Sequence, residues 1–320
     1  MGYITIAVAL LLLSVFAITY ARFRAEISGA REKVLAGSEI LKTDHGDIEY
    51  AVKGEGPPVL VLHGAGGGYD QGLLLSRSTG FGDSFKLISV SRFGYLRSPI
   101  PEDSSVEAQA ALYAILLDHL KVETVIVIGG SAGGPSALQF AHDYPDRCAA
   151  LILGAAISMP IAPDKDALHN KVIHSIQKSD FVYWGFNKVF GFLFLKLIGV
   201  PREVYKGFTL EQKQLAQELL NVMHPMSQRR RGSIHEFVIK PLDSASMSEI
   251  SSPTLILHAR DDALVNYEHA KFAHRNITQS KLVIFETGGH GLLPQVNAFR
   301  NHVSTFLNEQ VPSLRCPLKP

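Results

Sequence analysis

The sequence has few cysteines and almost no net charge. Cys148 and Cys316 are the two cysteines among 320 residues, and their spacing fits neither a metal site nor a disulfide framework. The 31 Lys and Arg and 30 Asp and Glu residues leave a formal net charge of +1. This balance gives no reason to expect nucleic acid or another polyanion as a partner. We expect the one basic run, Arg229–Arg231, to be a solvated face.

The long apolar run of the chain lies at its N-terminus. Residues Tyr3–Tyr20 are almost wholly apolar and carry no charge. At a rise of 1.5 Å per residue, about 18 residues span about 27 Å, close to the thickness of a bilayer core. We predict a single-pass membrane anchor over residues 1–21. A cleaved signal peptide, which would have basic residues before a shorter core, and a buried core helix are the alternatives.

Basic residues follow the apolar run, at Arg22, Arg24, Arg31 and Lys33, and none precedes it. The positive-inside rule therefore predicts that the rest of the chain is cytoplasmic. Nothing in the sequence fixes the oligomeric state.

Beyond the anchor, apolar strand-like runs alternate with helical patterns. Residues 22–38 predict a polar helical linker, and Glu39–Thr43 and Ile48–Val52 predict two short strands. Continuous apolar runs separated by helices are typical of an α/β fold with a mainly parallel, doubly wound sheet. The predicted buried strands are Val59–Leu62, Phe85–Val90, Thr124–Ile128, Leu151–Leu153, Thr254–His258 and Lys281–Phe285.

The alternation is interrupted once, from about Ile157 to Ile250, where the pattern is helical. We predict a helical cap over residues 157–250, inserted between core segments 39–156 and 251–310, with a C-terminal tail over 311–320. Ligands of such sheets bind at the edge that this insertion would cover. We expect most of the aromatic residues in it to form the cap's own core, and the others to line an apolar pocket or touch the membrane. These are Phe181, Trp184, Phe186, Phe190, Phe192 and Phe194.

Five residues, Gly129–Gly133, read G-x-S-x-G and stand between a predicted strand and a predicted helix. A serine on a sharp strand-to-helix turn is a nucleophile elbow. Glycines at 129 and 133 suit the turn because a side chain there would crowd the backbone where strand and helix nearly touch. Ser131 is the predicted nucleophile.

A serine hydroxyl becomes a good nucleophile only when a base accepts its proton. His290 is the predicted base, because it lies in a glycine-rich loop after the last predicted strand. Two acids, Asp261 and Asp262, follow the preceding strand, and we favour Asp262 as the group that orients His290. Asp261 would then cap the following helix or pair with Arg260.

Acyl transfer also needs donors for the oxyanion. The backbone N–H of Ala132 is one predicted donor, and the loop His63–Gly68 should supply the other, at Ala65 or, as runner-up, Gly66. The same loop has a competing interpretation as a dinucleotide-binding fingerprint. That match fails because Tyr69 stands where the third glycine is needed, so we predict no cofactor and no metal.

The turn at Ser131, the loops that carry Asp262 and His290, and the loop His63–Gly68 together resemble the motifs of α/β-hydrolases with a helical cap. The resemblance covers about residues 39–310 and implies a Ser–Asp–His triad at Ser131, Asp262 and His290. The family usually has Asp where Ser91 stands and Gly where Leu96 stands, positions that shape a turn. Its dehalogenases and epoxide hydrolases use an Asp nucleophile, against which Ser131 argues. The motifs are HGAGGG at 63–68, SRFGYLRS at 91–98, GGSAGG at 129–134, HARDDALV at 258–265 and GGHG at 288–291.

The sequence therefore predicts a serine hydrolase that cleaves an ester, thioester or lactone of a small, apolar acyl substrate. A C–C bond hydrolase or an acyltransferase with the same triad is the alternative. A non-catalytic ligand-binding protein on the same fold is an alternative of another class. The substrate itself lies beyond the sequence.

Overall fold

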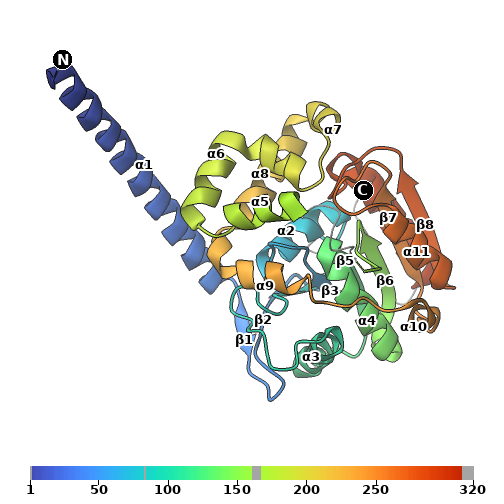
Figure 1. Cartoon of the computed structure of the whole chain (residues 1–320). Coiled ribbons are helices and arrows are strands. Elements are labelled where there is room, and N and C mark those ends of the chain that lie inside the picture. The colour runs from blue at the N-terminus through green and yellow to red at the C-terminus, as the bar shows by residue number, and fades with distance from the viewer. Residues whose placement is uncertain (1, 83, 161–166, 312–320) are drawn as a thin grey trace.

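A computed structural model describes residues 2–82, 84–160 and 167–311, which form a sheet of eight strands with helices on both faces (Figure 1). The predicted tail after residue 311 and Cys316 lie outside the described residues. Cys148 is buried as a free thiol. The strands are β1 Glu39–Leu41, β2 Ile48–Lys53, β3 Pro58–Leu62, β4 Lys86–Val90, β5 Val125–Gly130, β6 Cys148–Gly154, β7 Thr254–Ala259 and β8 Ser280–Phe285.

The strand order is β1-β2-β4-β3-β5-β6-β7-β8, with β1 and β2 antiparallel to their neighbours and the other six strands parallel. At the centre, Leu60 of β3 lies opposite Ile88 of β4 and Val127 of β5, and all three are fully buried. The predicted fold class, a mainly parallel doubly wound sheet, is confirmed.

Helices cover both faces of the sheet, which is why the central strands are apolar without alternation. On one face, α3 (Val106–His119), α4 (Gly134–Asp143) and α11 (Glu268–Asn276) bury apolar residues against it. On the other face lie α2 (Tyr69–Thr79) and α12 (Val296–Gln310), whose Phe299 and Val303 pack onto the strands. The carboxyl ends of the parallel strands are thereby left free to carry loops.

Between β6 and β7 the described residues form helices and no strand, as the sequence predicts. Four of these helices, α5 to α8, contribute to one apolar cluster that includes Tyr183, Phe194 and Leu220, and Leu293 from after β8 joins it. The helices are α5 Ala167–Ile176, α6 Asp180–Leu197, α7 Arg202–Lys206, α8 Leu210–Val222, α9 Arg230–His235 and α10 Ser244–Ser248.

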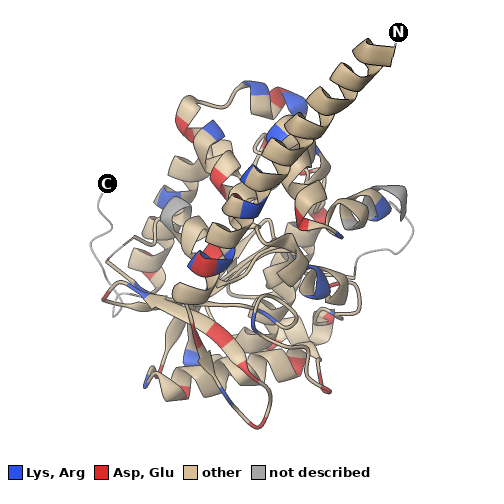
Figure 2. Cartoon of the chain, turned by 90° about the vertical axis from the view of Figure 1, so that its left-hand side faces the viewer, with Lys and Arg blue, Asp and Glu red and all other residues tan. Residues whose placement is uncertain are grey.

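The N-terminal segment forms one continuous helix, α1 (Gly2–Ala36), where the sequence predicts an anchor followed by a separate linker. The helix is long and apolar enough to cross a membrane, and its most apolar window is not buried at all. That exposure argues against the buried-core alternative. Farther along, Phe23, Ile27 and Val34 pack against the rest of the protein, while the first half projects away from it (Figures 1 and 2).

Candidate active site

Ser131 follows β5 directly and begins the short helix η1 (Ser131–Gly133), which leads into α4. Its φ angle is +51°, a left-handed conformation that a side chain strains. The turn is tight, as predicted for the two glycines. A Cβ on Gly133 would meet the carbonyl oxygens of Leu62 and His63, and one on Gly129 would lie 2.6 Å from Ala137 Cβ. The local sequence thus holds Ser131 on a strained turn at the edge of the sheet.

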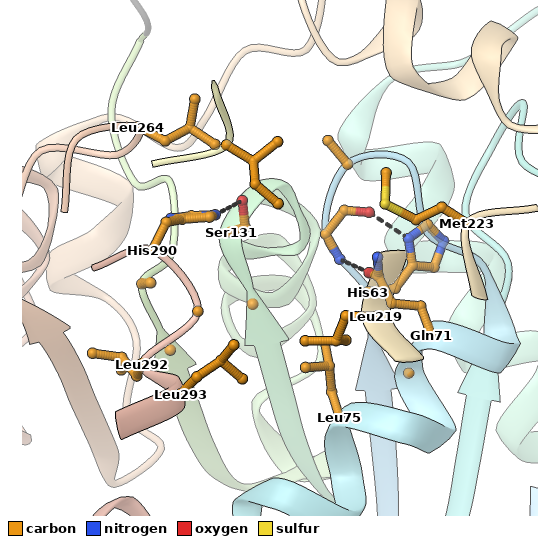
Figure 3. Close-up of a pocket in the computed structure, with 18 of the residues that line it drawn as sticks. His63, Gln71, Leu75, Ser131, Leu219, Met223, Leu264, His290, Leu292 and Leu293 are labelled. Carbon is orange, nitrogen blue, oxygen red and sulfur yellow. Dashed lines mark hydrogen bonds between the residues drawn. The ribbon is translucent and has the colours of Figure 1, made fainter. Parts of the chain in front are cut away.

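A chain of hydrogen bonds runs from Ser131 through His290 to Asp262. Ser131 Oγ lies 2.9 Å from His290 Nε2 (Figure 3), and His290 Nδ1 lies 2.8 Å from Asp262 Oδ2. Because the carboxylate can only accept, the network assigns the imidazole proton to Nδ1 and leaves Nε2 to accept from the serine hydroxyl. The structure therefore brings together the three side chains selected from sequence, from the ends of β5, β7 and β8.

Asp262 is fixed by more than His290. Its Oδ1 accepts the backbone N–H groups of Leu264 and Val265 at 2.9 Å each. The buried ring of His258, on β7, lies with Nε2 2.8 Å from the carbonyl of Val265 and 3.3 Å from Asp262 Oδ2. Burial alone would raise the pKa of Asp262, but the two histidines outweigh it and hold that pKa well below its usual range. The carboxyl of Asp262 is therefore ionised near neutral pH and can stabilise a protonated His290.

Asp261 has neither of the roles expected from sequence. Its Oδ1 accepts the backbone N–H groups of Gly288 and Gly289, at 2.9 and 2.8 Å. Arg260 pairs with Glu286 instead, at 3.0 Å. Asp261 thus ties down the loop that carries His290. The sequence analysis did not predict this contact, because Gly288 and Gly289 lie 27 and 28 residues away along the chain.

The loop after β3 lies against Ser131. A Cβ on Gly64 would be 3.1 Å from Ser131 Cβ, so the backbone passes beside the hydroxyl. Ala65 and Ser131 both line the cavity described below, and Ala132 is buried beneath the turn. Gln71 Oε1 accepts the N–H of Gly64 at 3.2 Å and fixes the loop. Ala65 and Ala132, the predicted oxyanion donors, thus lie on segments next to Ser131, and the Gln71 side chain supports the loop.

His63 begins this loop and is wholly buried. Its Nδ1–H donates to the carbonyl of Gly64 at 2.7 Å, and its Nε2 accepts the N–H of Arg92 at 3.1 Å. Burial, together with the charge of Arg92, holds the pKa of His63 well below its usual range. A neutral imidazole of fixed tautomer therefore braces the loop. Arg92 is itself buried and forms an ion pair with Glu236, the residue that follows helix α9.

Part of the basic run is buried, which corrects the expectation of a solvated face. Arg231 is exposed, but Arg229 is fully buried. Its guanidinium binds both oxygens of Asp70, at 2.9 and 2.6 Å, and donates to the carbonyl of Gly67 at 2.8 Å. The bidentate pair ties the inserted segment to the loop beside Ser131.

A cavity of about 280 Å³ opens beside Ser131 and His290 (Figure 3). The loops at the sheet edge form its floor, and α2, α5, α6 and α8 contribute walls, with Leu75, Phe194 and Leu219 among them. Its described lining is mostly apolar and contains no Lys, Arg, Asp or Glu. Across the described parts of the chain, no group of three or more His, Cys, Asp and Glu could hold a metal ion.

The family model described as alpha/beta hydrolase fold matches residues 57–295. An uncharacterised hydrolase of Bacillus subtilis, YcgS, is 28% identical over 264 residues, 79% of this chain and 91% of that protein. The 2-hydroxy-6-oxo-6-phenylhexa-2,4-dienoate hydrolase of Comamonas testosteroni is 27% identical over 263 residues, 76% of this chain and 84% of that protein.

A solved structure described as a membrane phospholipase A, a bacterial virulence factor, shares the fold with a TM-score of 0.65 at 20% identity. The similarity covers 97% of this chain and 99% of that one.

Proposed function

This chain belongs to the alpha/beta hydrolase fold family, and from that premise we propose that it is a serine hydrolase. It cleaves an ester, thioester or lactone through an acyl-enzyme intermediate. The observation that carries the proposal is the hydrogen-bonded chain from Ser131 to His290 to Asp262, on a strained strand-to-helix turn. A 2.9 Å contact between Oγ and Nε2 permits direct proton transfer as the serine attacks.

Each residue then has one role in the reaction. Ser131 Oγ bonds to the acyl carbon while His290 Nε2 takes its proton, and Asp262 holds the imidazole and stabilises its positive charge. The N–H groups of Ala132 and Ala65 bind the oxyanion. His290 returns the proton to the leaving group as the acyl-enzyme forms. A water, deprotonated by His290, then attacks the acyl carbon. The bond between that carbon and Ser131 Oγ breaks, and His290 returns the proton to Oγ.

The lining of the cavity favours an uncharged, apolar acyl group. A buried carboxylate needs a cation or several donors to replace its water shell. The described lining offers neither Lys nor Arg. The substrate of the Comamonas testosteroni relative is, by its name, a dienoate and so carries a carboxylate. Because the described lining offers no cation for that carboxylate, C–C bond hydrolysis of such an acid is the second candidate rather than the first.

We assign residues 157–250 to a helical cap and residues 39–156 and 251–310 to the hydrolase core. The support is that α5, α6 and α8 contribute Ile173, Phe194 and Leu219 to the cavity that contains Ser131. A cap that forms one wall of the pocket would select the substrate, while the core supplies the chemistry.

We also assign residues 1–21 to a single-pass anchor, with the catalytic domain on the cytoplasmic side. The support is the length and exposure of the apolar half of α1 and the basic residues that follow it. The likeness to the membrane phospholipase A extends through nearly the whole chain.

The deciding experiment compares the wild-type chain with Ser131→Ala. We expect wild type to react with a fluorophosphonate probe and to hydrolyse p-nitrophenyl esters, and the variant to do neither while remaining folded. Residual turnover by the variant would show that another residue is the nucleophile. Adding an alcohol acceptor and analysing the products separates hydrolysis from acyl transfer.

A further inference from the structure

Helix α6 exposes a row of apolar side chains on its outer face. Val182, Val189, Phe190 and Leu193 are 48%, 70%, 53% and 42% exposed. Val182 and Val189, seven residues apart, lie on one side of the first part of the helix. The helix kinks at Phe190, and Leu193 is exposed beyond the kink, while Tyr183 and Phe194 are buried in the inserted segment. We call the four exposed residues the α6 outer face. The solvent-facing side of a surface helix usually carries polar side chains.

The α6 outer face lies next to the point where α1 leaves the domain. The ring of Phe181, at the start of α6, contacts the rings of Phe16, Tyr20 and Phe23, with centroids 6.2, 5.8 and 5.0 Å apart. Phe16 and Tyr20 belong to the apolar run of α1. Apolar contacts therefore join α1 to the start of α6, and Figure 1 shows this end of α6 beside α1.

Polar contacts hold α1 against α6 just beyond the apolar run. Glu26 accepts a hydrogen bond from Trp184 Nε1 at 2.9 Å and pairs with Lys188 at 2.9 Å. Arg31 pairs with Asp180 at 3.1 Å. Burial alone would raise the pKa of Glu26, but the bonds from Trp184 and Lys188 outweigh it and lower that pKa. The angle between helix and domain is thus fixed at several points rather than left to a linker.

The residues at this level suit a membrane interface. Tyr20 is 40% exposed at the end of the apolar run, and the exposed Arg22 and Arg24 follow it. Trp184 is buried and contacts the rings of Phe23 and Phe181. Tyrosine and tryptophan concentrate at the headgroup level, and basic side chains are attracted to anionic lipid there. If the run of α1 crosses a bilayer, the start of α6 lies at its surface.

We propose that the α6 outer face rests in the headgroup layer of the bilayer that α1 enters, so that the catalytic domain is held against the membrane. The inference depends on the anchor put forward under the proposed function. A bilayer fits better than another protein because the surface continues that of the anchor itself. The inner face of the same helix supplies Phe194 and Leu195 to the cavity, so α6 separates the active site from lipid.

Fluorescence of a single tryptophan tests this placement. Trp184 is the only tryptophan of the chain, so Trp184→Phe gives a background to which Phe190→Trp or Leu210→Trp is added. Leu210 is the matched control, because it is 74% exposed at the start of α8 and does not belong to the α6 outer face. The full chain is reconstituted into phosphatidylcholine vesicles with brominated acyl chains. We expect quenching of the tryptophan at 190 and none at 210.

The outcomes separate the two proposals. Failure of the chain to float with vesicles removes the anchor and this inference with it. Flotation without quenching at position 190 overturns the inference alone. A blue shift at 190 that disappears when the protein is diluted in lipid shows that a second copy covers the face, which also overturns it.

A second variant asks whether the contact serves catalysis. Val189→Glu with Leu193→Glu, neither of which lines the cavity, is compared with Leu210→Glu. We expect the rate on an ester embedded in vesicles to fall at least about tenfold, since the burial of each of the two apolar side chains is worth about that factor. The rate on soluble p-nitrophenyl acetate should not change. Equal rates on the embedded ester for all three proteins would contradict the proposal.

Discussion

Asp261 Oδ1 accepts the backbone N–H of Gly289, the residue before His290, at 2.8 Å. Its neighbour Asp262 binds the ring of His290 itself. Two consecutive carboxylates thus act on one histidine by different routes, the first through the backbone of its loop and the second through its imidazole. This division of roles leads to two different predictions.

Asp262→Asn should reduce kcat by about 10³- to 10⁴-fold, because an amide no longer fixes the Nδ1–H tautomer or stabilises the imidazolium. KM should change little, since Asp262 does not line the described cavity. Steady-state kinetics on a soluble ester measure both. A loss of less than tenfold would mean that another group orients His290.

Asp261→Ala should lower kcat by about tenfold, the effect of a slightly displaced base. The matched variant Asp261→Asn keeps an acceptor for Gly288 and Gly289 and should remain close to wild type. If the two variants lose equal activity, the charge of Asp261 matters rather than its hydrogen bonds to the loop.

Arg229→Met should destabilise the protein by about 3–5 kcal/mol, because it leaves Asp70 and the carbonyl of Gly67 without their partner. Removing the acid as well, with Asp70→Leu, should recover part of that loss. Urea unfolding in detergent gives the free energies. The exposed Arg231→Met is the control and should stay within about 0.5 kcal/mol of wild type.

Acid should weaken the fold partly through His269. Burial lowers the pKa of His269 to about 4 from its ordinary 6.5, and its Nδ1 accepts the N–H of Ser158 at 3.1 Å. Between pH 6.5 and 4 the unfolded chain binds this proton and the folded chain does not, so stability falls as pH falls.

His269→Asn keeps an acceptor but does not titrate. Between pH 7.5 and 5, the free energy of unfolding of this variant should fall by up to about 2 kcal/mol less than that of wild type. Urea unfolding measures both values. His45→Asn, in an exposed turn, is the matched control. The same acid loss in the His269 variant and wild type would contradict the assignment.

Deleting residues 2–19 should move the protein from the detergent phase to the aqueous phase in a detergent phase-separation assay, with ester hydrolysis retained. This cut removes apolar residues that are exposed but keeps the docked part of α1, including Phe23 and Ile27. Deleting residues 2–36 should reduce solubility, because it uncovers Phe181 and Trp184. If the protein lacking residues 2–19 stays in the detergent phase, another part of the chain attaches it to the membrane.

Much of the site was accessible from sequence because its signals are local. Ser131 is marked by glycines within two residues on either side, and His290 by glycines and a preceding strand. Unbroken apolar runs predict the buried strands. Asp262 needed a choice between neighbours, since composition does not distinguish it from Asp261, and so did the second oxyanion donor, for which Ala65 and Gly66 are adjacent.

What the sequence alone determined was therefore the fold class, the order Ser131, Asp262, His290 and the apolar N-terminal run, all properties of short contiguous segments. The tertiary structure decided what each segment touches. Arg229 reads as a surface charge until Asp70, 159 residues away, is placed beside it, and Glu26 becomes a docking residue only through Trp184, 158 residues away. Burial and pairing of charges depend on such distant partners, and no local pattern specifies them.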